Sequence, residues 1–236
     1  MVRPHNGVVI LVLSIVPATL SAAQLTVTLD PVKTEVHWTL GGNLHTVHGT
    51  FKLKRGSMHL DDESGQATGE IIVDVASGES GNGTRDRRMQ KEILESPKFP
   101  EAVFTPDHVE GRLPAQGDGQ LSVHGAFRIH GASHEITLKM QVHRTGKDVT
   151  ATTQIGVPYV AWGMKNPSNF LFKVDDHVEM SITAAASVAD KRGSTISPVR
   201  ILCDGPADCI TATCGAAPAT AMAGELSGAS HFVSAH

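Results

Sequence analysis

The sequence predicts an all-β protein whose antiparallel strands close into a barrel. Apolar and polar residues alternate with period two in most segments between residues 30 and 184, which is typical of half-buried strands. Hydrophobic residues make up 40% of the chain and aromatic residues 4%, a balance that suits a sheet protein better than a helical bundle. A β-sandwich fits the same spacing. However, small residues are mixed with large ones at the alternate strand positions that face inward, which favours a barrel of about eight strands.

The first residues of the chain have the composition of a signal peptide. Arg3 supplies a positive charge, residues 8–16 form an uncharged apolar run, and Ser21-Ala22-Ala23 offers the small residues that precede a cleavage site. The apolar run is shorter than the roughly 20 residues of a spanning helix. We therefore expect residues 1–23 to be removed, leaving a periplasmic or secreted protein with no integral membrane segment.

Several segments with this alternation are expected to form strands. In chain order, they are 32–40, 47–53, 67–75, 121–129, 136–142, 149–157 and 178–184. The segments 121–129 and 136–142 are separated by His130-Gly131-Ala132-Ser133-His134, whose glycine permits a chain reversal. These two segments should therefore pair as a hairpin.

Two segments interrupt the strand pattern. Residues 85–95 are rich in helix formers, with Met89 and Ile93 four apart and Pro97 just beyond, so we expect a short helix with its apolar side toward the barrel. Residues 162–172 contain Gly, Pro and Asn among apolar side chains and are expected to form a loop. A loop with so many apolar side chains is expected to cover another apolar surface.

The chain divides into three parts by composition. After the signal peptide, residues 24–190 form one barrel domain without cysteine, and residues 191–236 form a tail of small residues that is expected to be flexible. The tail holds Cys203, Cys209 and Cys214, whose pairing the sequence leaves open. A short disulfide loop is favoured over a metal site because no His lies between these residues at zinc-finger spacing.

Charge and motifs argue against several functions. The formal net charge of −4 is spread along the chain, and no block of Lys and Arg indicates a nucleic-acid partner. Gly78-Glu79-Ser80-Gly81 lacks the last glycine of a nucleophile elbow, and His134-Glu135 lacks the second His of a zinc protease motif. We predict no enzyme activity, no catalytic residues, no cofactor and no metal.

The thirteen histidines leave a less favoured alternative. His124 and His143 fall on the outward parity of the predicted hairpin, where they would be diagonal neighbours and could hold a metal at the surface. A surface metal-dependent enzyme therefore stays open as a minor hypothesis.

Several short motifs, in their order and spacing, resemble the YceI-like family of lipid-binding proteins across residues 25–188. They are Leu29-Asp30-Pro31, Thr34-Glu35-Val36-His37-Trp38, Val47-His48-Gly49-Thr50-Phe51, Arg85-Asp86, Phe99-Pro100-Glu101-Ala102-Val103-Phe104, Leu121-Ser122-Val123-His124-Gly125 and Val174-Asp175-Asp176-His177-Val178-Glu179-Met180.

The resemblance implies a lipocalin-like barrel in an exported bacterial protein, with an internal channel that holds a polyisoprenoid, an isoprenoid quinone or a fatty-acid derivative. It implies no catalytic residue. The chain departs from the commoner pattern at residues 161–171, which leaves the length and headgroup of the ligand open.

The inward parity and the two interrupting segments supply the candidate ligand-binding residues. They are Trp38, Phe51, Ile71, Val73, Met89, Leu94, Phe127, Met140, Trp162 and Phe170. If these side chains fill a dry core instead, the protein would be a solid scaffold or stress-related interaction module. Arg85 and Asp86 are either a polar gate to the channel or a helix N-terminal feature, and the sequence leaves a homodimer open.

Overall fold

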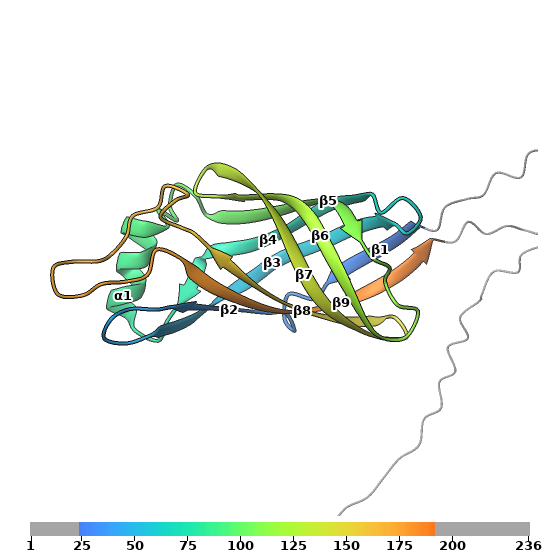
Figure 1. Cartoon of the computed structure of the whole chain (residues 1–236), viewed down its shortest axis with the longest axis horizontal. Helices are drawn as coiled ribbons and strands as arrows, with labels where there is room; N and C mark the ends of the chain where they lie inside the picture. Colours follow the sequence, from blue (N-terminus) through green and yellow to red (C-terminus); the bar gives the residue numbers. More distant parts are fainter. Residues whose placement is uncertain (1–23, 192–236) are drawn as a thin grey trace, which may run out of the picture. The chain divides into compact units, whose positions relative to one another are not determined.

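The computed structural model describes residues 24–191, which form one β-barrel with a short helix at one end (Figure 1). Its elements are β1 (Gln24–Leu29), β2 (Glu35–Leu40), β3 (Val47–Asp61), β4 (Ala67–Glu79), α1 (Gly83–Arg88), the π-helical turn η1 (Met89–Ile93), β5 (Glu101–Glu110), β6 (Gly117–Ile129), β7 (Ala132–Thr145), β8 (Asp148–Val157) and β9 (Val178–Lys191). The predicted signal peptide and cysteine-containing tail lie outside the described residues.

The barrel is closed and entirely antiparallel. Neighbouring strands from β4 to β9 pair in sequence, and β3 pairs with β4 to complete the ring. β1 and β2 share one position: β1 pairs with residues 57–61 of β3 and 186–191 of β9, whereas β2 pairs with residues 47–51 and 179–183 of the same strands. Nine strands therefore fill eight positions, which confirms the predicted barrel of about eight strands.

A short turn interrupts the position that β1 and β2 share. The Asp30 carboxylate accepts hydrogen bonds from the backbone N–H groups of Val32 at 2.9 Å and Lys33 at 3.3 Å, an Asx turn that gives the backbone an alternative to the ladder. Val32 is consequently 92% exposed. The prediction of a continuous strand over residues 32–40 was wrong at its start, and the strand begins at Glu35.

The predicted hairpin is present as β6 and β7. Ile129 pairs directly with Ala132, so only His130 and Gly131 remain in the turn, and both have positive φ angles of 50° and 81°. This two-residue turn matches the right-handed twist of the strands. The turn is shorter than the five residues predicted, because residues 132–134 already belong to β7.

β5 was not among the strands predicted by alternation, because a bulge breaks its period. The register between β5 and β6 shifts between Pro106 and His108, and a bulge is one of the few places where a strand tolerates proline. Pro106 is fully buried and lies opposite Gly125. A Cβ atom on Gly125 would stand 2.3 Å from the Thr105 carbonyl oxygen, so glycine permits this close strand approach.

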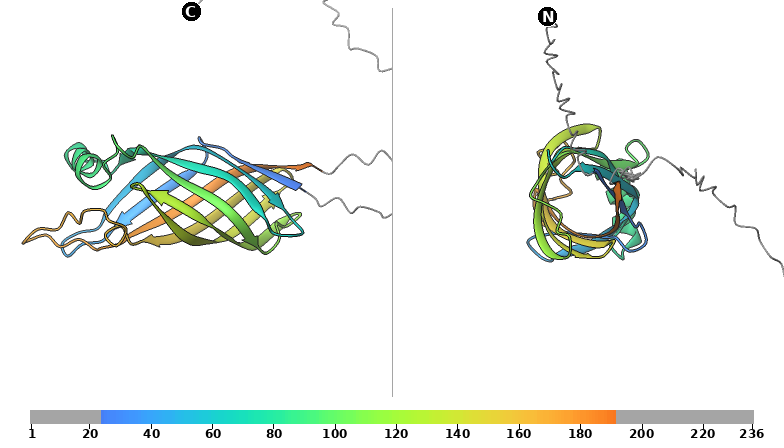
Figure 2. Two further views of the ribbon diagram at one scale, coloured as in Figure 1. Left: turned by 90° about the horizontal axis from the view of Figure 1, so that it is seen from above. Right: turned by 90° about the vertical axis from the view of Figure 1, so that its right-hand side faces the viewer.

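Buried apolar side chains from most of the strands form one core cluster. It lies toward the end of the barrel where β1 begins and β9 finishes (Figures 1 and 2), and we call this the packed end. The cluster includes Leu25, Leu60, Phe104, Val109, Leu121, Val123, Val142, Val149 and Val188. The interior of the other end is bordered by α1, the β2–β3 turn and the loop between β8 and β9.

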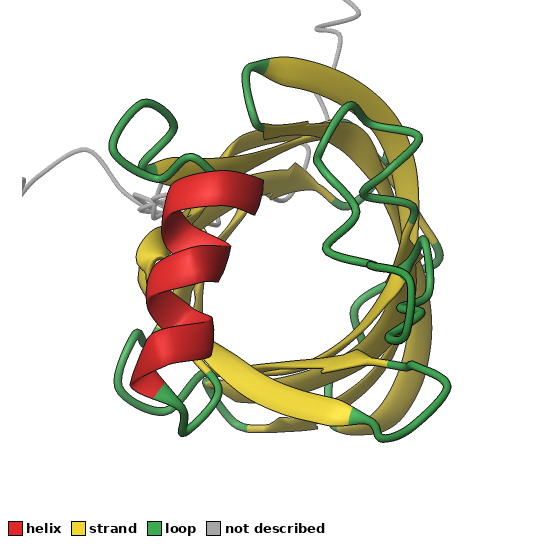
Figure 3. Cartoon of the chain, turned by 90° about the vertical axis from the view of Figure 1, so that its left-hand side faces the viewer, coloured by secondary structure: helices red, strands yellow, loops and turns green. Residues whose placement is uncertain are grey.

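The short helix lies at the rim of that other end (Figure 3). The Asn82 side chain caps it by accepting hydrogen bonds from the Thr84 and Arg85 backbone N–H groups at 3.1 Å. Gln90 anchors the following turn by donating to the carbonyl oxygens of Val75 at 2.9 Å and Gly78 at 3.2 Å. The predicted helix over 85–95 is confirmed in place, although it starts at residue 83 and its second half is π-helical.

Within residues 24–191, no helix combines the length and the hydropathy needed to cross a bilayer.

Candidate functional site

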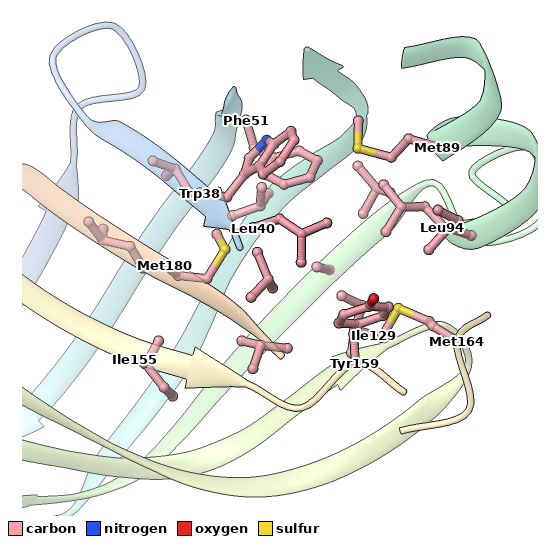
Figure 4. A pocket seen from close by; sticks show the side chains of 18 of the residues that line it. Trp38, Leu40, Phe51, Met89, Leu94, Ile129, Ile155, Tyr159, Met164 and Met180 are labelled. Carbon is pink, nitrogen blue, oxygen red and sulfur yellow. The ribbon is translucent and has the colours of Figure 1, made fainter. Parts of the chain in front are cut away.

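A cavity of about 440 Å³ occupies the half of the barrel next to α1. Most of its lining side chains are apolar, and Figure 4 shows Trp38, Phe51, Met89, Leu94 and Met180 around it. The polar residues in the lining are His45, Arg85, Arg88, Thr153, Tyr159 and Asn169. The volume falls within the roughly 300–1,000 Å³ of small-molecule pockets.

Side chains point alternately to the two faces of a strand, and this alternation determines which residues form the cavity walls. Every second residue of β8 from Ala151 to Val157, and every second residue of β9 from Val178 to Ala184, faces the cavity. Six residues separate the ends of the β9 segment, which corresponds to about 20 Å along the strand. Ala151 and Ala184 pair across the two strands and leave the lumen wide just before the packed end begins.

Most of the predicted ligand-binding residues line this cavity. They are Trp38, Phe51, Ile71, Val73, Met89, Leu94, Phe127 and Met140. These residues come from five strands and from the helical segment, so closure of the barrel is what brings them together.

Trp162 and Phe170 were also predicted to contact a ligand, and neither is part of the cavity lining. The Trp162 ring stacks on His134, with ring centroids 4.0 Å apart and planes inclined by 7°, and it also lies near Phe127. Phe170 is 94% exposed. The prediction of a ligand contact failed for both residues because they lie in a loop. A loop has no regular alternation from which the direction of a side chain can be inferred.

The same loop supplies cavity residues that the prediction omitted. Tyr159 and Met164 are buried next to Val157, and Phe172 reaches the lining from the loop tip. The alternation in β8 and β9 was itself a sufficient signal for Ile155 and Met180, whereas nothing local in the sequence distinguishes Met164 from Phe170.

Two hydroxyl groups in the cavity lining are hydrogen-bonded within the protein. The Thr153 hydroxyl donates to the Lys139 carbonyl oxygen at 2.8 Å, and the Tyr159 hydroxyl donates to the Asp175 carbonyl oxygen at 2.8 Å. Burial, together with Asp176 and Asp175, raises the pKa of Tyr159 to about 12, so the phenol stays neutral at physiological pH. The interior therefore offers an uncharged, apolar surface.

Positive charge is confined to the helical segment of the lining. Arg85 donates from Nε to the Ser80 hydroxyl at 2.7 Å and from Nη2 to the Ser80 carbonyl oxygen at 2.9 Å. Asp86 accepts from the same hydroxyl, and Arg88 pairs with Glu92 at 3.2 Å. Arg85 therefore belongs to the start of the helix and also lines the cavity, whereas its role as a polar gate stays a prediction.

Asp107, His124 and Glu135 form the closest group of metal-binding side chains among the described residues, with ligand atoms within 4.8 Å. Nδ1 of His124 faces Asp107 at 2.8 Å and Nε2 faces Glu135 at 3.7 Å. The hydrogen bond to the Asp107 carboxylate raises the pKa of His124, and the ring lies between two carboxylates.

The predicted proximity of His124 and His143 is wrong. His143 lies opposite Asp118 and contacts it at 2.6 Å. Asp118 is six residues from His124 along β6, or about 20 Å, which separates the two histidines.

The chain matches the model of the YceI-like domain over residues 27–186. UPF0312 proteins of Vibrio vulnificus and Vibrio campbellii are 28% and 25% identical to it over 104 residues, which is 43% of this chain and 53% of each relative. The chain thus spans about half the length of the curated relatives it matches.

Two solved structures are similar to this barrel. One is a polyisoprenoid binding domain from Saccharophagus degradans implicated in plant cell wall breakdown, with a TM-score of 0.52, 15% identity, and coverage of 69% of this chain and 98% of that one. The other is BcnA of Burkholderia cenocepacia, with a TM-score of 0.55, 20% identity, and coverage of 68% and 99%. At these identities, the likeness establishes a common fold.

Proposed function

This chain belongs to the YceI-like domain family, and from that premise we propose that it is a binding protein that holds one long apolar molecule inside its barrel. The observation that carries the proposal is the cavity of about 440 Å³, whose lining is mostly apolar and whose Thr153 and Tyr159 hydroxyls are hydrogen-bonded within the protein. Such a surface binds hydrocarbon by removing it from water, and outside the helical segment it contains no Asp, Glu, Lys or Arg.

Energetics favour long ligands over short ones. Each buried methylene contributes about 0.8 kcal/mol, so a chain of about 15 carbons gains about 12 kcal/mol. Association itself costs about 4–15 kcal/mol. A short hydrocarbon cannot offset this cost, whereas a polyisoprenoid, an isoprenoid quinone or a long fatty-acid derivative can. The ligand named for the Saccharophagus degradans domain supports the isoprenoid class.

The distribution of polar residues supports one orientation of the ligand. Its apolar chain extends toward Ala151 and Ala184 at the packed end, and its polar end lies near Arg85 and Arg88. In the reverse orientation, a headgroup would be buried among Leu138, Ile182 and other apolar side chains without a partner, which is costly.

The amino-terminal pattern supports export, so the proposed protein binds its ligand in the periplasm or outside the cell. A protein there would keep a lipid dispersed in water between membranes. No reaction is proposed for the cavity, because Thr153 and Tyr159 are both engaged in structural hydrogen bonds.

Tryptophan fluorescence can test the proposal. The chain has two tryptophans, and Trp162→Phe leaves Trp38 in the cavity wall as the reporter. Titration with a polyprenol, an isoprenoid quinone and palmitate should change Trp38 emission to saturation at one ligand per chain for at least the isoprenoids.

Two alanine substitutions on β9 form a matched control. Ala184→Phe fills the cavity floor and should abolish or strongly weaken the titration, whereas Ala189→Phe adds the same ring at an exposed position and should not. If no ligand gives a saturable change in the Trp162→Phe protein, the barrel is a solid scaffold and the proposal fails.

A further inference from the structure

Two loops join into one projection beside the cavity. The Asn43 backbone N–H donates to the Lys173 carbonyl oxygen at 3.0 Å, and the Lys173 N–H donates to Asn43 Oδ1 at 3.0 Å. Asn43 Nδ2 also donates to the Leu171 carbonyl oxygen at 3.3 Å, and the Asp175 N–H donates to the Gly41 carbonyl oxygen at 3.0 Å. These bonds fasten the β2–β3 turn to the loop between β8 and β9.

The end of this projection carries four exposed apolar side chains, which we call the apolar tip: Leu44, Phe170, Leu171 and Phe172. Their exposed fractions are 64%, 94%, 67% and 45%. Asn169 holds the tip in a defined turn, because its Oδ1 accepts from the N–H groups of Leu171 at 2.9 Å and Phe172 at 2.8 Å. The turn thus directs large apolar side chains into water, which is costly without a partner.

The apolar tip lies at the mouth of the cavity. Asn169, Phe172 and His45 of the projection line the cavity as well. The loop between β8 and β9 also reaches further along the barrel axis than α1 in both side views (Figures 1 and 2). A flat surface that meets this end of the barrel therefore meets the tip first and the cavity mouth next.

Basic residues next to the apolar tip fit an anionic surface. Residues 161–174 contain Lys165 and Lys173 and no acidic residue, whereas Asp175 and Asp176 follow directly and leave the loop as a whole without net charge. Residues 41–46 contain no Asp, Glu, Lys or Arg. The neighbouring helical segment, residues 83–93, has four basic and two acidic residues. Apolar side chains flanked by lysines are typical of segments that bind the interface of a membrane.

A membrane suits the tip better than a protein partner does. A specific protein interface needs about 800 Å² and roughly 20–30 residues on each side, whereas the tip consists of four side chains on a narrow projection. A bilayer needs no complementary shape, because it accepts single apolar side chains into its acyl region.

We propose that the apolar tip is a docking site for a phospholipid bilayer, into which Phe170 and Leu171 insert. Docking places the cavity mouth against the lipid surface, so an apolar molecule can pass between bilayer and barrel without crossing water. That consequence rests on the function proposed above, whereas the docking itself does not.

Insertion can be measured with brominated lipids. In Phe170→Trp, the new indole should be quenched by vesicles of phosphatidylcholine and phosphatidylglycerol with brominated acyl chains, beyond any quenching seen in the unsubstituted chain. Val32→Trp is the matched control, because Val32 is about as exposed as Phe170 but lies between Asp30 and Thr34, which both hydrogen-bond to Ala185. Ala185 is about 20 Å along β9 from Val178. The indole of the Val32→Trp protein should not be quenched further.

Vesicle flotation of the chain, purified as its host produces it, measures the contribution of the tip. The double substitution Phe170→Ser and Leu171→Ser should lower the partition coefficient by about tenfold or more for each side chain that inserts, and Val32→Ser should leave it unchanged. Salt should weaken binding to phosphatidylglycerol vesicles but not abolish it.

Three results would overturn the docking proposal. They are equal flotation of the tip variant and the unsubstituted chain, quenching that is the same at positions 32 and 170, and a dimer in sedimentation velocity that the tip substitutions dissociate. The tip variant should still bind a polyprenol delivered from ethanol. If the unsubstituted chain docks on vesicles but binds no polyprenol, the proposed function is refuted and the docking proposal stands.

Discussion

The hydroxyl of Tyr159 donates a 2.8 Å hydrogen bond to the backbone carbonyl oxygen of Asp175, which joins the two ends of the loop between β8 and β9. Tyr159 is 5% exposed and packs with Val157 and Met164, and it also lines the cavity. One side chain is therefore both a part of the cavity wall and the attachment of the loop that forms the mouth.

Tyr159→Phe should loosen this loop without changing the shape of the wall. The substitution removes a hydrogen bond and leaves the Asp175 carbonyl oxygen without that partner, so we expect a loss of about 1 kcal/mol in the free energy of unfolding in urea. Hydrogen exchange at the Met164 amide, which donates to the Tyr159 carbonyl oxygen at 3.0 Å, should become faster. Unchanged exchange would show that packing alone holds the loop.

The same phenol predicts a loss of stability at alkaline pH. Its pKa is raised from 10.0 to about 12 in the folded protein, so the folded state retains this proton where the unfolded state has lost it. The stability from the neutral phenol is complete below about pH 10 and is lost as the pH rises to about 12. Between pH 10 and pH 12, the melting temperature of the native sequence should fall more steeply with pH than that of Tyr159→Phe.

Gly49 is required by the position of Trp38. A Cβ atom at residue 49 would stand 2.3 Å from indole carbons of Trp38 and 2.2 Å from the Glu79 carbonyl oxygen. Gly49→Ala should therefore displace the indole or the strand, lower stability by about 1–3 kcal/mol, and shift the emission of Trp38.

Gly83→Ala is the control for this substitution. Its Cβ atom would lie 3.6 Å from Arg87 Nη1, with nothing nearer outside its own helix backbone, and it should be neutral or stabilise by up to about 1 kcal/mol. Equal destabilisation by both substitutions would mean that the effect comes from glycine itself and not from Trp38.

His124 should make a small contribution to stability on the acid side of neutrality. The hydrogen bond with Asp107 raises its pKa above 6.5, with support from Glu135 and Glu110. A raised folded-state pKa means that the contribution is fully present below about pH 6.5 and is lost as the pH rises through the higher folded value.

Melting temperatures of the native sequence and Asp107→Asn, compared from mildly acidic to mildly alkaline pH, test this prediction. The difference between the two proteins should be largest at the acidic end of the range and should shrink as the pH rises. If the difference in melting temperature stays constant with pH, Asp107 affects stability by some route other than its interaction with His124.

Alternation in the sequence predicted the strands that follow it strictly, including the β6–β7 hairpin and the inward direction of Phe127 and Met140. It missed β5, in which Pro106 forces a bulge, and also β1, although Leu25, Val27 and Leu29 alternate there with polar residues. Parity fails wherever an extra residue shifts the register, since each such shift reverses the faces of the residues that follow.

The cavity could be predicted only in part, for a different reason. Parity identifies which side chains point inward, but it does not show that the inward side chains leave space. That depends on the closed ring and on small residues such as Ala151 and Ala184 meeting across β8 and β9. The direction of Phe170 depends on the turn that Asn169 sets, and that of Trp162 on a separate turn in which its backbone N–H donates to the Pro158 carbonyl oxygen; no periodicity records either turn.

The central claim is that the barrel holds one long apolar molecule, and native mass spectrometry of the protein purified from its own host tests it most directly. We predict a mass excess of one hydrophobic molecule per chain, which organic extraction releases and which is absent from Ala184→Phe but retained in Ala189→Phe. A clean ligand-free mass in the native sequence, with no uptake of added polyprenols or quinones, would contradict it.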